Sequence, residues 1–331
     1  MPETILVLAE QQQSKLNRVS LETVAAAQAI AKETGWQVEI AVLGHDIAAT
    51  AEELAGNKAA RVYAIESPQL AAYTSDAYVH VLKEFLAGRQ PKLVLMPHTY
   101  QVRDFAPRLA LALGKTVIPD AVGYKYENGK LLFTRQMFQG KFAADVSFSD
   151  AGPLWMATFQ NAAFRGDAAE VGTAPVETLQ VTVPDGVIRV QPHEIFREAR
   201  QAVDLSQSEA IVAVGRGIKE QKNLAMAEEL AKLLGGDIAA SRPICDAGWL
   251  PLDRQVGSSG QTIAPKLYIA LGISGAIQHI VGMKGSRTII AINKDAEAPI
   301  FEIADIGVVA NLFDIVPPLM EEMKKVKAGA Y

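Results

Sequence analysis

The chain has 331 residues, which is enough for about two domains. Hydrophobic residues make up 49% of the sequence and charged residues 21%, the balance of an ordinary soluble globular protein. The formal net charge of -5 argues against a general nucleic-acid binder, which usually carries a basic surface, so we expect no nucleic-acid partner.

Cysteine usage, histidine spacing and the apolar runs exclude further classes of protein. Cys245 is the only cysteine, so it cannot form an intramolecular disulfide, and the five histidines contain no H-x-x-x-H pair. The N-terminus lacks the pattern of a signal peptide, and no apolar run approaches the roughly 20 residues of a membrane span. We therefore expect a cytoplasmic protein with no metal site and no direct membrane insertion.

The first part of the chain alternates short apolar strands with helices. The predicted strands are Ile5–Ala9, Val38–Leu43, Arg61–Ile65 and Lys92–Met96, and the predicted helices are Leu21–Glu33, Ile47–Leu54, Tyr73–Leu86 and Val102–Leu113. Such alternation is typical of a mostly parallel sheet covered on both faces.

Short β runs follow, and they predict an antiparallel extension of this sheet. They are Val122–Tyr126, Leu131–Arg135, Phe142–Phe148 and Leu154–Phe159, with Glu177–Val183 as a candidate for one more strand. Asn128-Gly129 lies between two β-prone runs and is a strong hairpin signal. The polar segment Glu194–Ser208 is the expected connection, so we place an N-terminal α/β domain at residues 1–205 and a second domain at 206–331.

The second domain shows its own α/β pattern, which predicts a doubly wound parallel sheet. Its strands are Ile211–Val214, Ile238–Ser241, Leu267–Leu271, Thr288–Ile292 and Ile306–Val309, and its main helices are Gln221–Leu234 and Leu312–Val326, the latter starting around Pro317-Pro318. Gly235-Gly236 ends the first of these helices where a left-handed residue is needed.

The stretch Leu267–Asn293 is a compact βαβ unit with a glycine-bearing turn. After Gly272 the residues Ser274, Gln278 and His279 lead into a short helix. Open α/β sheets bind ligands beyond the carboxyl ends of their strands, and a helix N-terminus there favours an anion.

Polar residues or glycines follow the other strands of this domain as well. Gly215-Arg216-Gly217 lacks the third glycine of a dinucleotide fingerprint, so it is a weak motif, and a solvated arginine in a glycine turn is an equally good interpretation. Arg242 alone is more often a surface residue, although a guanidinium can stack on a planar heterocycle. The loop Gln255–Thr262 is either a mobile connection or a set of small donors around a cofactor.

His279 is usually a structural histidine in such a position, but it follows a glycine-containing turn at the sheet edge, which favours a ligand contact. Asn293 and Asn311 complete the predicted ring of polar groups at the strand ends. Since no nucleophile motif, P-loop or paired carboxylates are present, the chemistry is expected to belong to a bound cofactor.

The run LYIALGISGAIQH…G…IIAIN resembles the electron transfer flavoprotein α subunit family. The resemblance extends through NKDAEAPIFEIADIGVVANLFDIVPPL and back through SRPICDAGWLPLDRQVGSSG to VAVGRG, and covers Ile211–Met320. It implies FAD as cofactor and a heterodimer with a β subunit, which commonly binds AMP. It also implies flavin dehydrogenases, such as the acyl-CoA dehydrogenases of fatty acid β-oxidation, as electron donors and a quinone oxidoreductase as acceptor.

The resemblance also implies the residues that contact FAD. They are Arg216, Ser241, Arg242, Val256, Gly257, Ser258, Ser259, Ser274, Gly275, Ala276, Ile277, Gln278, His279, Asn293, Asn311 and Leu312. Arg242 would lie beside the isoalloxazine and His279 by its pyrimidine-side carbonyl, where positive charge and donors raise the potential and favour an anionic semiquinone. The sequence departs from many members at Ser258-Ser259, where they have Gln-Thr, and at Asn311, where they have Asp.

Three alternatives to a simple electron shuttle remain at this point. The chain could be the α subunit of a flavin-based bifurcating complex that oxidises NADH, whose β subunit carries a second FAD. It could also be a stand-alone flavin dehydrogenase, which needs an acid or base near the flavin, or a nucleotide-sensing module without a redox role. The sequence contains no acid–base pair that favours the dehydrogenase.

Overall fold

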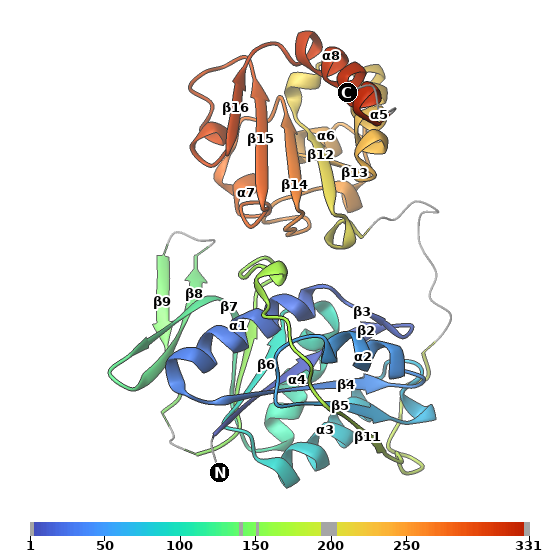
Figure 1. Ribbon diagram of the computed structural model, residues 1–331, viewed down its shortest axis with the longest axis vertical. Coiled ribbons are helices and arrows are strands. Elements are labelled where there is room, and N and C mark those ends of the chain that lie inside the picture. Colours follow the sequence, from blue (N-terminus) through green and yellow to red (C-terminus); the bar gives the residue numbers. More distant parts are fainter. Residues whose placement is uncertain (1–2, 139–141, 150–151, 193–203, 328–331) are drawn as a thin grey trace. The chain divides into compact units, whose positions relative to one another are not determined.

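A computed structural model describes residues 3–138, 142–149, 152–192 and 204–327. The chain forms two compact units, Met1–Ile195 and Phe196–Tyr331 (Figure 1). Most of the predicted connection Glu194–Ser208 lies outside the described residues, so the boundary after residue 205 stays a prediction. Leu205 itself is fully buried in the core of the second unit.

The described part of the first unit contains a nine-stranded sheet in the order β11-β5-β4-β1-β6-β10-β7-β8-β9. The strands are β1 (Thr4–Ala9), β4 (Gln37–Gly44), β5 (Arg61–Glu66), β6 (Leu93–Pro97), β7 (Val117–Glu127), β8 (Lys130–Met137), β9 (Phe142–Val146), β10 (Trp155–Phe159) and β11 (Val176–Gln180). The pairs β7–β8 and β8–β9 are antiparallel, which confirms the predicted antiparallel extension for these three strands. The other pairs are parallel, so the prediction is wrong for Leu154–Phe159, which forms β10.

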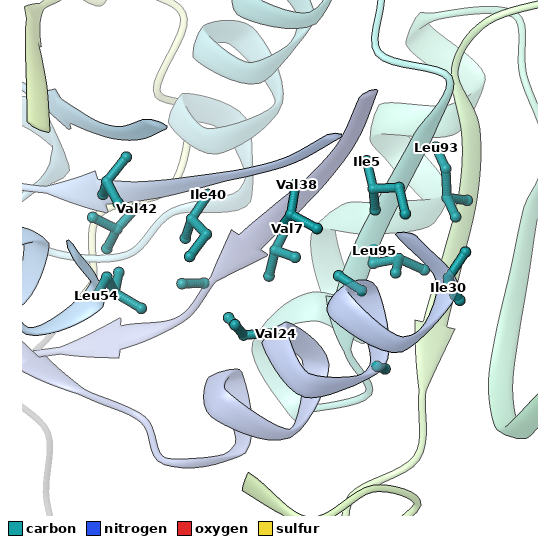
Figure 2. Close-up of a cluster of buried hydrophobic side chains, with 14 of the residues drawn as sticks. Ile5, Val7, Val24, Ile30, Val38, Ile40, Val42, Leu54, Leu93 and Leu95 are labelled. Atoms are coloured by element: carbon teal, nitrogen blue, oxygen red, sulfur yellow. The ribbon is translucent and has the colours of Figure 1, made fainter. Parts of the chain in front are cut away.

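Among the described residues, four α-helices and two hydrophobic clusters cover this sheet. The helices are α1 (Val19–Thr34), α2 (Ala48–Ala55), α3 (Ser75–Arg89) and α4 (Tyr100–Ala112). Alternate residues of the central strands point to opposite faces, so Ile5 and Val7 pack against α1 while Leu6 and Leu8 join α3 and α4 (Figure 2 shows the first cluster). This two-sided burial is the reason why the parallel strands have continuous apolar sequences.

Three features of the first sheet differ from or extend the sequence prediction. Strand β10 is inserted in parallel between β6 and β7, and β11 pairs with β5 at the opposite edge. The segment between β1 and α1, for which no strand was predicted, forms the two-residue strands β2 (Gln11–Gln12) and β3 (Lys15–Leu16). A strand's neighbours depend on long-range pairing, which a local pattern does not encode.

The second unit contains a five-stranded parallel sheet in the order β13-β12-β14-β15-β16 among its described residues. The strands are β12 (Ala210–Val214), β13 (Asp237–Ala240), β14 (Leu267–Leu271), β15 (Thr288–Asn293) and β16 (Ile306–Val309). The chain first runs from β12 to β13 and then crosses to β14 on the other side of β12. The point of reversal therefore lies between β12 and β14, where open α/β sheets bind ligands.

Different elements cover the two faces of this second sheet. The helices are α5 (Leu224–Leu234), α6 (Arg242–Asp246), α7 (Ile277–Ile280) and α8 (Leu312–Lys327). Helices α5, α6 and α8 pack on one face, whereas α7 and irregular segments cover the other. None of the described helices has the length and hydropathy that crossing a bilayer requires.

Helix α8 begins earlier than its prolines suggested. The predicted range Leu312–Val326 agrees with the observed helix, but its expected start around Pro317-Pro318 is wrong, because the helix begins at Leu312 and both prolines lie inside it. Leu312, Val316 and Met320 are buried in one stripe against the sheet and α5. The burial of this stripe outweighs the backbone hydrogen bonds that the prolines cannot donate.

Candidate functional site

The carboxyl ends of the five parallel strands in the second unit bring the predicted polar residues to one edge. Gly215 follows β12, Ser241 follows β13, Gly272 follows β14, Asn293 ends β15 and Asn311 comes shortly after β16. Because neighbouring strands are paired in register and all run in the same direction, these positions must lie at the same edge.

Glycines allow the backbone turns to touch at the point of reversal between β12 and β14. A Cβ added to Gly215 would lie 2.5 Å from the Gly272 carbonyl oxygen, and one added to Gly217 would lie 2.6 Å from the Gly272 Cα. The N–H of Gly217 also donates to the Gly272 carbonyl at 3.1 Å. The glycines of the GxG motif therefore serve packing between two turns of the protein.

The loop after α6 is seated directly on α7, although about twenty residues separate them in sequence. The N–H of Ser258 donates to the Gln278 carbonyl at 2.7 Å. Gly257 has φ +139°, and a Cβ there would lie 2.6 Å from that same carbonyl oxygen. Gly282 lies against the backbone of Gly257. The predicted segments Val256–Ser259 and Ser274–His279 are thus in direct backbone contact at Gly257, Ser258 and Gln278.

The short helices at this edge correct one prediction. The sequence suggested a helix N-terminus as an anion site, but α7 has only four residues and α6 only five. A helix macrodipole needs several aligned peptide units, so one turn contributes little. The capacity to bind an anion must come from side chains and from individual N–H groups.

Several polar side chains at this edge are exposed and have no hydrogen-bond partner among the described residues. Arg216, Ser258, Ser274 and Gln278 are exposed and form no side-chain hydrogen bond or ion pair with any described residue. Arg242 is 68% exposed, and its Nε lies 3.4 Å from an Asp246 carboxylate oxygen. The site therefore presents two guanidinium groups and several neutral donors to a ligand.

Other predicted residues play roles within the protein. The Asn293 side chain donates to the Ile273 carbonyl at 2.9 Å and accepts from the Asp295 N–H at 3.0 Å, so it holds the turn after β14. Ser259 Oγ accepts from Gln255 Nε2 at 2.9 Å, which leaves its hydroxyl hydrogen free to donate. Buried residues beneath the surface are Ser241, Val256, Gly257, Gly275 and Leu312.

Exposed apolar surface lies next to these polar groups. The Ile277 side chain is 70% exposed at the start of α7, and Ala276 beside it is also exposed. A large apolar side chain next to free donors suits a ligand with both a ring system and polar edges.

His279 lies beneath the exposed surface. It is buried, and its Nε2 lies 2.8 Å from the hydroxyl of Tyr268, which is fully buried on β14. Burial lowers the pKa of His279 to about 4, with a smaller opposite effect from the Val256 backbone. Its Nδ1 is buried without a hydrogen bond of good geometry to any described residue. The ring is therefore neutral at pH 7, and its direct contact with a cofactor stays a prediction.

Sequence reasoning missed Tyr268, and it gave Gln255 no role beyond membership of the loop Gln255–Thr262. Tyr268 was hidden in an apolar strand pattern, and only its position opposite His279 gives it a role. Gln255 is 4% exposed and supports Ser259 from below. A buried polar residue inside an apolar run is a weak signal, because its partner lies elsewhere in the sequence.

Two family models match the chain in the positions of the two units. The model described as the electron transfer flavoprotein domain matches residues 5–184. The model described as the electron transfer flavoprotein FAD-binding domain matches residues 204–284, which include most of the site. The two matches define a two-domain flavoprotein whose cofactor is FAD.

Known relatives are similar over nearly their whole length. Electron transfer flavoprotein subunit alpha of Thermoanaerobacterium thermosaccharolyticum is 38% identical over 324 residues, covering 98% of each chain. The protein of the same name from Bacillus subtilis is 36% identical over 326 residues, again covering 98% of each. The acryloyl-CoA reductase electron transfer subunit beta of Anaerotignum propionicum is 35% identical, covering 98% of this chain and 96% of its own. The chain belongs to the electron transfer flavoprotein alpha subunit family.

The residues at the site fit FAD chemically. The cofactor carries a diphosphate and a planar ring system with polar edges, and the site offers Arg216, Arg242, free hydroxyls and exposed apolar surface. The buried Nδ1 of His279 adds an incompletely satisfied polar atom under the same surface. The two guanidinium groups suit the diphosphate, and the hydroxyls and apolar surface suit the ring system and its polar edges.

Proposed function

We propose that this chain is the FAD-carrying subunit of an αβ heterodimer that shuttles electrons from flavin dehydrogenases to a quinone oxidoreductase or another respiratory acceptor. The observation that carries the proposal is the set of exposed, uncommitted donors at the carboxyl edge of the second sheet. The names of the relatives, which are alpha subunits, support a β subunit as partner.

The residues of the site would divide the binding of FAD between them. Arg216, at the point of reversal between β12 and β14, is placed for a phosphate oxygen, which a guanidinium binds with two parallel hydrogen bonds. Ser258, Ser274 and Gln278 would orient the polar edges of the cofactor. Bound FAD would supply the redox chemistry, because its ring system accepts and gives up electrons.

The protein would tune that chemistry through charge. Arg242 is a permanent cation at physiological pH, and a cation beside the ring stabilises the negative charge that reduction adds. Its Asp246 neighbour, 3.4 Å away and 58% exposed, offsets part of this field. A neutral His279 contributes a dipole in place of a second charge.

The test is to co-express the chain with its β subunit and to examine the purified complex. We expect a yellow complex with one FAD in this chain, which is bleached by anaerobic reductant and accepts electrons from an acyl-CoA dehydrogenase. A pure complex without flavin would contradict the proposal. Turnover of a substrate by this chain alone would favour a stand-alone dehydrogenase.

A second candidate follows from the relative named as an electron transfer subunit of acryloyl-CoA reductase. In that case this chain would be the α subunit of a bifurcating complex that oxidises NADH. The complex would deliver electrons to a reductase. The two candidates differ in flavin content and in donor. Two FAD molecules per heterodimer and rapid reduction by NADH would support the second candidate, whereas one FAD and no reaction with NADH would support the first.

A further inference from the structure

We propose that Tyr268 is a positioning residue for the FAD site: its hydroxyl donates to His279 Nε2, fixes the imidazole with its proton on Nδ1, and so supports the loop Val256–Ser259 from below. The inference rests on the proposed function for the identity of the ligand. The contact between Tyr268 and His279 stands independently of it.

The pair is isolated from solvent and from other partners. Tyr268 is 0% exposed and His279 is 6% exposed, and their polar atoms lie 2.8 Å apart. Among the described residues the Tyr268 hydroxyl forms no other hydrogen bond. A buried hydroxyl without a partner is unfavourable, so this single contact holds both side chains.

The chemistry of the two groups decides which one donates. Burial keeps the Tyr268 phenol protonated, since its pKa lies well above the ordinary value, and burial keeps His279 neutral. A phenol is a good donor, and the lone pair of a neutral imidazole nitrogen is a good acceptor. With Nε2 accepting, the remaining ring proton must be on Nδ1.

The Nδ1–H group would then act on the loop. The Val256 backbone raises the pKa of His279, which is the effect of a carbonyl next to a ring N–H, although the geometry falls short of a hydrogen bond. The next residue, Gly257, packs so closely that an added Cβ would lie 3.4 Å from the His279 Cα. His279 therefore lies under the part of the loop that leads to the exposed Ser258 and Ser259.

The first experiment reads the position of the ring proton. In the αβ complex labelled with 15N-histidine, the His279 signals are assigned by their loss in His279→Gln. We expect a protonated Nδ1 and an accepting Nε2 in the wild type, and loss of this single form in Tyr268→Phe. A proton on Nε2 in the wild type, or an unchanged spectrum in Tyr268→Phe, would overturn the inference, and either result can be obtained without flavin.

The second experiment tests whether Tyr268 acts through His279. FAD affinity is measured for Tyr268→Phe, His279→Gln and the double variant, with thermal melting as a check of folding. We expect Tyr268→Phe to weaken FAD binding about tenfold in the wild type but less than twofold in the His279→Gln background, because coupled residues are not additive. Fully additive losses would mean that Tyr268 is only a core residue.

A matched control is available in the first unit. Tyr78 is also buried, and its hydroxyl donates to the Leu43 carbonyl at 3.4 Å. Tyr78→Phe removes a comparable hydroxyl and is expected to leave both the His279 spectrum and FAD affinity unchanged. A complex that contains no flavin but shows the expected ring proton would overturn the proposed function and keep the Tyr268–His279 contact.

Discussion

Both units have a sheet edge where parallel strands end in polar residues, but the two edges differ in how their hydrogen bonds are used. In the first unit the Thr99 hydroxyl donates to Glu10, and His98 Nδ1 lies 2.8 Å from Thr158 Oγ1. Thr158 Oγ1 also accepts from the Asp120 N–H at 2.9 Å. The polar groups of this edge satisfy one another.

In the second unit the corresponding side chains are left free. Arg216, Ser274 and Gln278 are exposed without a side-chain partner among the described residues. The comparison teaches that polar residues at a carboxyl edge do not by themselves define a binding site. Unused hydrogen-bonding capacity is the property by which the second edge differs from the first, and it supports our proposal that the second edge binds the ligand. Four sets of changes test this difference.

The largest effect is expected where the loop meets α7. Gly257→Val places a side chain at φ +139° and against the Gln278 carbonyl, which strains the loop by about 3 kcal/mol and should weaken FAD binding roughly a hundredfold. Gly123→Val is the control in the first unit, because an added Cβ there meets nothing within 4 Å. Equilibrium dialysis of FAD measures both. Unchanged FAD affinity in Gly257→Val would show that this loop does not take part in FAD binding.

Opposite responses to pH should distinguish the two units. Burial lowers the pKa of His279 to about 4 from 6.5, so the unfolded chain takes up a proton first as pH falls. The second unit should therefore lose roughly 3 kcal/mol of stability between about pH 6.5 and pH 4. His279→Gln should remove this loss in urea unfolding followed at each pH. A loss that persists in the variant would assign it to another group.

The first unit should lose stability as pH rises, opposite to the second unit. Burial raises the pKa of Glu22 to about 8 from 4.5, against a smaller opposite effect of the hydrogen bond from the Ala162 N–H at 2.6 Å. The folded state holds a proton that the unfolded chain releases, so stability falls as pH rises from about 4.5 to 8. Because the side chain is only partly buried, we expect about 2 kcal/mol. Glu22→Gln should abolish the fall, whereas Glu53→Gln on the exposed face of α2 should not.

A moderate effect on potential is expected from the arginine at the start of α6. Arg242→Gln removes a cation beside the proposed position of the flavin ring. It should lower the equilibrium constant for flavin reduction about tenfold, which corresponds to a reduction potential lower by roughly 30 mV for two electrons. Arg103→Gln changes an exposed arginine on α4 of the first unit and should leave the potential unchanged. Equal shifts in both variants would break the distinction between the two edges.

The smallest effect is expected at the start of α8. The Asn311 side-chain oxygen lies 3.5 Å from the Phe313 N–H, so Asn311→Asp adds a carboxylate at a helix N-terminus. This should stabilise the second unit by about 0.5 kcal/mol and change FAD affinity by less than about threefold. The first unit should be unaffected in urea unfolding. A large loss of affinity would show that Asn311 contacts FAD through its neutral amide.

The sequence by itself predicted the helices and strands and the sheet edge that we propose as the ligand site. Apolar runs predicted the parallel strands, because buried parallel strands require continuous apolar residues, and β-prone runs separated by turn residues predicted the antiparallel ones. Residues that follow those strands, such as Arg216, Arg242 and Gln278, could be selected as site candidates, because open α/β sheets bind ligands beyond the carboxyl ends of their strands. The order of β10 and β11 could not be predicted, since strand pairing depends on distant contacts.

Only the tertiary structure decided how the polar residues are used. It showed that Asn293 holds a turn, that His279 lies buried against Tyr268, and that Gly215 and Gly217 serve contact with Gly272. A sequence lists the donors and acceptors of a chain but not their partners, which lie far away along the chain. The difference between a satisfied edge and a free one therefore appears only after the chain has folded.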